Sequence, residues 1–181
     1  MFTNEEQKRI TLIDSQHVTG NLGLLILEAC RLRDAGVGAA EICSHIENLI
    51  PKVRLYALVQ SLKYLRLGGR VSGSAAAVGN LLSISPIITT VNGSIVVAGK
   101  IRRSNNAFRK WLRDKLLTDM PDPQYPAVYL HSNNPALTQP LKEEFRYLFP
   151  PATSLSLPIG AVVGTHAGPG AVGLCYISRG E

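Results

Sequence analysis

The segment PIITTVNGSIVVAGKI, residues 86–101, carries the clearest folding signal in the chain. Two runs of β-branched residues flank the dipeptide Asn92-Gly93, and such an arrangement is the strongest short-range indication of a β-hairpin. An isolated hairpin is only marginally stable in water, so the chain on either side has to supply further strands or helices.

Four other runs of apolar and β-branched residues are typical of strands: 53–59, 126–132, 154–160 and 170–178. Three helical patterns separate them: 61–69, 74–84 and 136–149. A fourth helix is predicted to begin after an N-cap at Ser104, and its apolar stripe is expected to pack onto the sheet, although a partner groove is the alternative. This order predicts an α/β (α+β) fold with a mixed sheet in two layers, covered mainly on one side.

The N-terminal part, residues 1–51, is expected to differ from residues 52–181. KRITLID (8–14) reads as a short strand, and helices are predicted over 21–36 and 39–50. The first of these helices is apolar on nearly every side until Cys30, which indicates burial. A single strand cannot build a sheet, so this part lacks the companion strands that it needs.

The charge of the chain is unevenly distributed. Nineteen Lys and Arg residues against thirteen Asp and Glu give a net charge of +6, and no acidic residue occurs from Asn48 to Arg113. Such a segment attracts anionic ligands, acidic protein surfaces or nucleic acid, and the alternative is a solvated face without a partner. Nucleic acid is the less favoured partner, because aromatic residues are few and are not interleaved with the basic ones.

Several protein classes are not supported by the sequence. No run approaches the ~18 consecutive apolar residues of a membrane helix, and the N-terminus lacks the apolar block of a secretory signal. The cysteines Cys30, Cys43 and Cys175 are odd in number and scattered, which favours buried reduced thiols in a cytoplasmic protein over disulfides or a metal site. There is no GxSxG motif and no activated cysteine, so we do not predict an enzyme.

Two glycine-rich segments are candidate binding sites. GTHAGPG (164–170) is expected to be a loop that exposes backbone N–H groups beside Thr165 and His166, or else simply a tight loop with a hydrogen-bonded histidine. In LGGRVSGS (67–74), Gly68 and Gly69 would end a helix and direct Arg70 toward a carboxylate or phosphate, unless Arg70 is an ordinary surface residue.

Four segments together resemble the DegV family, bacterial fatty-acid-binding proteins of the fold shared with dihydroxyacetone kinase. They are IDSQHVTGNLGLLILEA, YLRLGGRVS, LLSISPIITTVNGSIVVAGKIRR and GTHAGPGAVG, and the resemblance runs from Lys8 to Tyr176. It implies an N-terminal α/β domain, a C-terminal mixed-sheet domain and one long-chain fatty acid between them, with no cofactor or metal.

The resemblance also implies roles for individual residues. Arg70 and His166 would hold the fatty-acid carboxylate together with hydroxyl groups of the first domain, and Thr165 and Gly168 would complete the ligand site. In the better-understood branch the protein presents its fatty acid to a kinase that forms an acyl phosphate. The basic surface that contacts the kinase would fall on Arg102 and Arg103.

The chain departs from the family pattern in two ways. A TSQPS-like segment and the earlier strands of the first domain are absent, so residues 1–51 are expected to be a remnant of that domain and 52–181 the lipid-binding domain. Asn105 and Asn106 stand where further Lys or Arg would be expected for kinase docking. The alternative to a carrier is therefore a truncated or vestigial fragment without a ligand, for which an apolar flank exposed around Leu22–Leu27 would speak.

Overall fold

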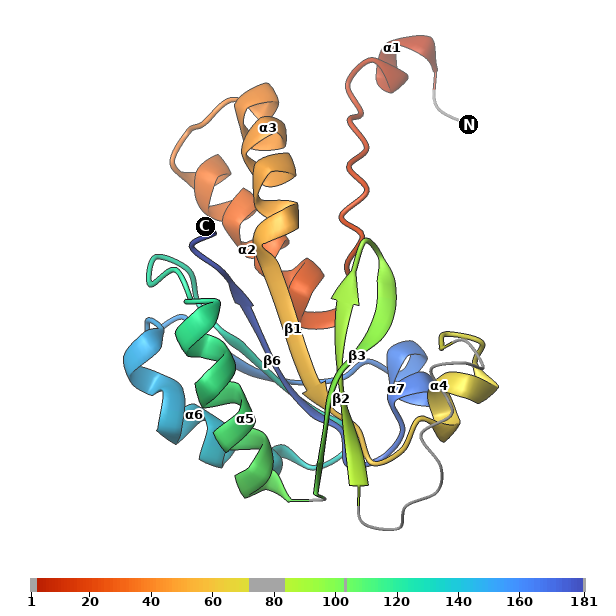
Figure 1. The fold of residues 1–181 in the computed structure, drawn as a ribbon. Helices are drawn as coiled ribbons and strands as arrows, with labels where there is room; N and C mark the ends of the chain where they lie inside the picture. Colours follow the sequence, from red (N-terminus) through yellow and green to blue (C-terminus); the bar gives the residue numbers. More distant parts are fainter. Residues whose placement is uncertain (1–2, 72–83, 103, 181) are drawn as a thin grey trace.

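The structure is a computed structural model that describes residues 3–71, 84–102 and 104–180 (Figure 1). The helix expected over 74–84 and the candidate residue Arg103 lie outside the described residues, except for Ile84, which begins a strand.

A six-stranded mixed sheet forms the centre of the molecule, with strand order β3-β2-β1-β6-β4-β5. The strands are β1 (Val53–Leu58), β2 (Ile84–Val91), β3 (Ser94–Arg102), β4 (Val128–His131), β5 (Leu155–Pro158) and β6 (Val172–Ile177). All neighbouring pairs are antiparallel except β4 and β5, which are parallel. The predicted mixed α/β fold is therefore confirmed.

The hairpin predicted from Asn92-Gly93 joins β2 to β3. Both residues have positive φ angles, 48° and 74°, and Val91 pairs with Ser94 across the two-residue turn. Positive φ at both central positions is the type I′ geometry whose twist matches that of paired strands. Further along, a register shift between Ile87 and Ile88 interrupts the ladder.

Helices lie on both faces of the sheet (Figure 1). The helices are α1 (Asn4–Gln7), α2 (Thr19–Asp34), α3 (Ala39–Leu49), α4 (Lys63–Leu67), α5 (Asn105–Thr118), α6 (Gln139–Phe145) and α7 (Ala161–Ala167), with short 3-10 turns at Ile50–Lys52, Pro135–Leu137 and Arg146–Leu148. On one face, Phe108 and Leu112 of α5 and Phe145 of α6 pack onto the sheet. The stripe behind Ser104 thus packs onto the sheet, as predicted.

The opposite face carries α2 and α3, which belong to the segment assigned by sequence to a separate N-terminal part. Leu24 and Leu25 of α2 are buried in the same core as Ile46 and Leu49 of α3. At the start of α2, a side chain on Gly20 would come within 2.9 Å of the Cys175 sulfur, so the helix lies directly against β6. This second layer of helices is why both faces of the sheet are covered, whereas one covered face was expected. The division into two domains stays a prediction.

The segment before α2 differs from the prediction. Residues 10–18 belong to no helix or strand and pair with no strand among the described residues, so the strand expected over 8–14 is not formed. The backbone turns locally instead: Asp14 Oδ1 accepts a hydrogen bond from the amide of Gln16, and Ser15 Oγ accepts one from that of His17. A strand needs a hydrogen-bonded neighbour, and the apolar pattern of KRITLID alone does not supply one.

Candidate functional site

The two glycine-rich segments come together at one end of the sheet. Helix α4 follows β1, and helix α7 precedes β6, which is the neighbour of β1, so the two helices pack side by side (Figure 1). The segment GTHAGPG was expected to be a loop. In the structure, however, Thr165 and His166 form the last turn of α7. Only the glycines that follow turn the chain, with positive φ angles at Gly168 and Gly170.

The ring of His166 rests on Gly68, the first glycine of the GGR segment. A Cβ atom built on Gly68 would overlap Nδ1 and Cε1 of His166. Gly68 has an ordinary φ of −83°, so its backbone does not require glycine. The contact with the histidine ring is therefore the reason that a side chain does not fit here.

The reciprocal contact joins Tyr64 of α4 to Gly168, just after α7. A Cβ atom on Gly168 would overlap the Tyr64 ring and lie 2.8 Å from its Cε2 atom. We call the pair of contacts, His166 on Gly68 and Tyr64 on Gly168, the α4–α7 junction. Gly168 was expected to let a ligand approach the backbone and Gly68 to end a helix before Arg70; in the structure each glycine also accommodates an aromatic ring.

The polar groups of the α4–α7 junction are only partly satisfied. Nδ1 of His166 is buried and has no hydrogen-bond partner among the described residues. Arg70 is exposed, and its guanidinium donates to the Gly68 carbonyl oxygen at 2.8 Å. Both candidate ligand residues thus contact Gly68. The Thr165 hydroxyl donates to the Val162 carbonyl within its own helix, at 2.7 Å.

Of the two candidate partner-binding residues, only Arg102 lies within the described part of the chain. Arg102 is exposed at the end of β3, where it pairs with Ile84. The strand register places this position at the same end of the sheet as the α4–α7 junction. Arg103 lies outside the described residues.

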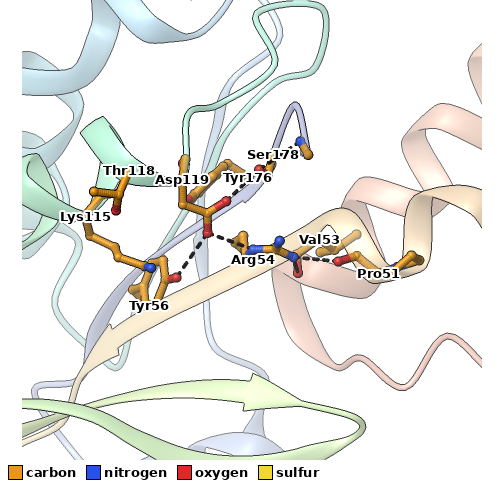
Figure 2. A network of polar contacts seen from close by, with 10 residues as sticks. Pro51, Val53, Arg54, Tyr56, Lys115, Thr118, Asp119, Tyr176 and Ser178 are labelled. Atoms are coloured by element: carbon orange, nitrogen blue, oxygen red, sulfur yellow. Dashed lines mark hydrogen bonds and ion pairs between the residues drawn. The ribbon is translucent and has the colours of Figure 1, made fainter.

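A second polar region occupies the opposite end of β1 and β6 and was not found by sequence reasoning. Figure 2 shows Asp119, directly after α5, at its centre. Its Oδ2 atom accepts hydrogen bonds from Arg54 Nε at 2.8 Å and Tyr56 at 3.3 Å, and its Oδ1 atom accepts one from Ser178 at 2.6 Å. The Asp119 backbone carbonyl accepts a further bond from the Tyr176 hydroxyl. We call these residues the Asp119 network.

The environment of Asp119 favours its charged form. Burial alone would raise the pKa of this carboxyl, but the hydrogen bonds from Ser178 and Arg54, with the charges of Arg54 and Lys115, outweigh burial and lower the pKa. Burial raises the pKa of the Tyr56 and Tyr176 phenols, which remain neutral donors. The network is therefore a fixed ion pair surrounded by neutral hydroxyl groups.

A hollow of about 930 Å³ lies beside the Asp119 network. Its walls come from the hairpin tip at Thr89–Gly93, the end of α5 and residues 178–180 after β6. A smaller hollow adjoins it at Asp14 and Ser94. Neither of these two hollows is lined by Arg70 or His166.

The described residues contain no group of three or more His, Cys, Asp or Glu residues placed to hold a metal ion. Among the same residues, no helix has both the length and the apolar character needed to cross a bilayer.

The chain is similar to curated DegV proteins from several bacteria. A DegV domain-containing protein of Clostridium acetobutylicum is 33% identical over 178 residues, covering 96% of this chain and 61% of the relative. Protein DegV of Bacillus subtilis is 32% identical over 157 residues, covering 85% of this chain and 55% of the relative. The chain thus spans about three fifths of the length of such relatives.

Solved structures and a family model agree with these relatives. A DegV family protein from Thermus thermophilus, described by its fatty-acid binding, superposes with a TM-score of 0.83 at 26% identity, over 96% of this chain and 62% of that one. A fatty-acid-binding DegV family protein from Streptococcus agalactiae superposes at 0.79 with 26% identity, over 98% and 63%. The family model described as "Uncharacterised protein, DegV family" matches residues 1–179. The chain therefore belongs to the DegV family.

Proposed function

We propose that this protein binds a long-chain fatty acid and holds the carboxylate at Arg70 and His166. The observation that carries the proposal is the α4–α7 junction, which brings a guanidinium and an imidazole from distant segments to the same glycine. The two solved relatives described as fatty-acid-binding support the choice of ligand. Thr165 and Gly168, on the same turn as His166, complete the proposed site.

The proposed division of labour follows from the chemistry of a fatty acid. Burying the tail contributes roughly 0.8 kcal/mol per CH₂, so ~15 methylenes offer on the order of 12 kcal/mol before the cost of binding. The head group serves to avoid an unpaired charge and to fix the orientation. Arg70 supplies the permanent charge for that purpose, and His166 adds a donor.

The packing of His166 suggests which of its nitrogens faces the ligand. Nδ1 is buried against Gly68 and has no hydrogen-bond partner within the described part of the chain. A buried N–H without an acceptor is rarer in proteins than an under-satisfied acceptor. The hydrogen of the neutral ring is therefore assigned to Nε2. In this tautomer the histidine donates a hydrogen bond to the carboxylate without needing a positive charge.

The proposal includes presentation of the bound fatty acid to a kinase that phosphorylates its carboxylate, so that this chain is a carrier and not itself the enzyme. The exposed position of Arg102 at the ligand end of the sheet supports such a docking surface. Arg103 would extend it, whereas Asn105 and Asn106 reduce its positive charge relative to a fully basic segment.

The first test is carboxylate selectivity. We expect Arg70→Ala to bind palmitate and methyl palmitate with similar affinity, because it removes the charged donor and leaves the tail contacts; the unaltered protein should prefer palmitate by about tenfold. Competition against a fluorescent fatty acid measures both ligands. Arg66→Ala is the matched control, an exposed arginine on α4 near the same site. Equal weakening of both ligands by Arg70→Ala would contradict the assigned role.

The alternative of a fragment without a ligand has one observation in its favour. The outer face of α2 exposes Leu22, Ile26 and Leu27, of which Ile26 is 53% accessible. Mass spectrometry of lipids extracted from the purified protein separates the two possibilities. A fatty acid in stoichiometric amount is expected from a carrier, and its absence, together with no binding of added palmitate, would favour the fragment.

A further inference from the structure

The hollow at the opposite end of the sheet from Arg70 and His166 has a marked excess of positive charge. We call it the polar groove. Its charged lining residues are Arg54, Lys115 and Arg179 against one carboxylate, that of Asp119. Arg54 already forms an ion pair with Asp119, at 2.8 Å. Lys115 and Arg179 remain without a carboxylate within ion-pair distance among the described residues.

The ammonium of Lys115 and the backbone of Arg179 are held by the surrounding structure. Lys115 is half-buried, and its ammonium lies 5.8 Å from the centre of the Tyr56 ring, in cation–π geometry (Figure 2). Tyr56 is in turn held by its hydrogen bond to Asp119. Arg179 is exposed, and its backbone amide donates to the carbonyl of Met120, which anchors the end of the chain beside α5.

The other walls of the polar groove combine hydrogen-bonding and apolar groups. Thr89 and Asn92 of the hairpin offer a hydroxyl and an amide, while the apolar lining includes Ile50, Val53, Val91, Leu117 and Met120. A hollow of about 930 Å³ is at the upper end of the size range of small-molecule sites. Its chemistry suits a ligand with one strongly anionic end and an uncharged body.

We propose that the polar groove binds a phosphate monoester, with the phosphate between Lys115 and Arg179. A phosphate monoester carries nearly two negative charges at neutral pH, which matches the two cations that form no ion pair with another described residue. Lysine and arginine are both suited to phosphate oxygens, the first as a point charge and the second as a planar fork. The Asp119 carboxylate does not repel such a ligand strongly, because Arg54, Tyr56 and Ser178 already neutralise and hydrogen-bond it.

The test uses phenyl phosphate as the probe and the full chain labelled with ¹⁵N. Titration is expected to shift the backbone amide signals of residues 89–93, 117–120 and 178–180, with saturation in the millimolar range. Lys115→Met keeps the length of the side chain but removes the charge, and should weaken binding about tenfold. Arg179→Gln, at an exposed position that does not threaten folding, should weaken it as well.

Two controls test whether binding depends on the charge of Lys115 and on the phosphate group of the probe. Lys110→Met removes the same charge from an exposed position on α5 outside the groove and should leave the affinity within about twofold. Benzyl alcohol, which lacks the phosphate, should not bind, and palmitate should not compete. Shifts confined to other residues, equal weakening by Lys110→Met and Lys115→Met, binding of benzyl alcohol, or displacement by palmitate would each overturn the proposal.

Discussion

The two ends of the central strands are built in different ways. At the α4–α7 junction the contacts are aromatic rings on glycines, and Arg70 donates to a backbone carbonyl. The Nδ1 atom of His166 has no partner in residues 3–71, 84–102 and 104–180. At the other end, Asp119 accepts hydrogen bonds from three side chains and forms an ion pair with Arg54. The same β-sheet therefore carries one region with unused polar capacity and one in which the central carboxylate is fully engaged.

This difference separates the proposed binding role of Arg70 and His166 from the structural role of Asp119. A buried polar network with every member satisfied holds its elements in one arrangement, whereas a buried polar atom without a partner calls for a further explanation such as a ligand. We therefore expect substitutions in the Asp119 network to act mainly on stability. Substitutions at the α4–α7 junction should alter ligand recognition as well.

The largest expected effect is that of Asp119→Ala on stability. The side chain is only 15% exposed, and its removal leaves Arg54, Tyr56 and Ser178 without their shared acceptor. We expect the free energy of unfolding to fall by about 3 kcal/mol, as is typical when one partner of a largely buried ion pair is removed. Urea unfolding followed by circular dichroism measures this change.

Asp114→Ala is the matched control for Asp119→Ala. Asp114 is an exposed carboxylate on α5, the helix that precedes Asp119, and has no ion pair within 4 Å among the described residues. Its removal should therefore change the unfolding free energy by no more than about 0.5 kcal/mol. If the two variants were equally stable, the Asp119 network would not be the structural region that its contacts indicate.

A smaller effect on stability, with a second effect on binding, is expected for Gly68→Ala. The new methyl group would overlap the His166 ring, while the backbone at φ −83° accepts alanine without strain. Overpacking of this kind costs about 2 kcal/mol in the free energy of unfolding. Displacement of the ring should also reduce the preference for palmitate over methyl palmitate, measured by the same competition assay as for Arg70→Ala.

Two further variants, one at Gly69 and one that combines Gly68→Ala with His166→Ala, show whether the stability cost of Gly68→Ala comes from the His166 ring. Gly69 has a φ of +68° but nothing within 4 Å of an added Cβ atom, so Gly69→Ala tests backbone strain without a clash, at about 1 kcal/mol. In a His166→Ala background, Gly68→Ala should cost almost nothing, because the ring that it would meet is gone. A full cost in that background would show that the contact with His166 is not what limits position 68.

The elements that the sequence predicted well are those whose signals are local. Asn92-Gly93 specified the hairpin, and Ser104 caps α5 through its hydroxyl, which accepts from the amide of Ala107. The strand expected over 8–14 failed because strand formation depends on a neighbouring strand, which no local pattern reveals. The order of the six strands is likewise set by pairing between distant segments, such as β1 with β6.

The candidate sites were also predicted only as far as local sequence signals allow. Unusual glycine content pointed to both halves of the α4–α7 junction, but the reason for the glycines was missed, since the ring on Gly168 belongs to Tyr64 in a distant segment. No local spacing signals this contact, because Tyr64 and Gly168 lie far apart in the sequence. Asp119 gave no signal at all, since its partner Arg54 is 65 positions away.

The smallest predicted effect is a narrowing of the stability difference between the unaltered protein and Asp119→Ala at low pH. The folded protein lowers the pKa of Asp119 below its ordinary value of 3.8, because the hydrogen bonds from Ser178 and Arg54 and the nearby charges outweigh the opposing effect of burial. The unfolded chain therefore binds a proton first as the pH falls. The stabilisation from Asp119 is complete above pH 3.8 and is lost as the pH falls through the folded pKa. Urea unfolding of both proteins at about pH 7, 5 and 3 should give equal gaps at the two higher values and a smaller gap at the lowest. A gap that stayed constant or widened at the lowest pH would mean that the charge of Asp119 does not stabilise this end of the sheet.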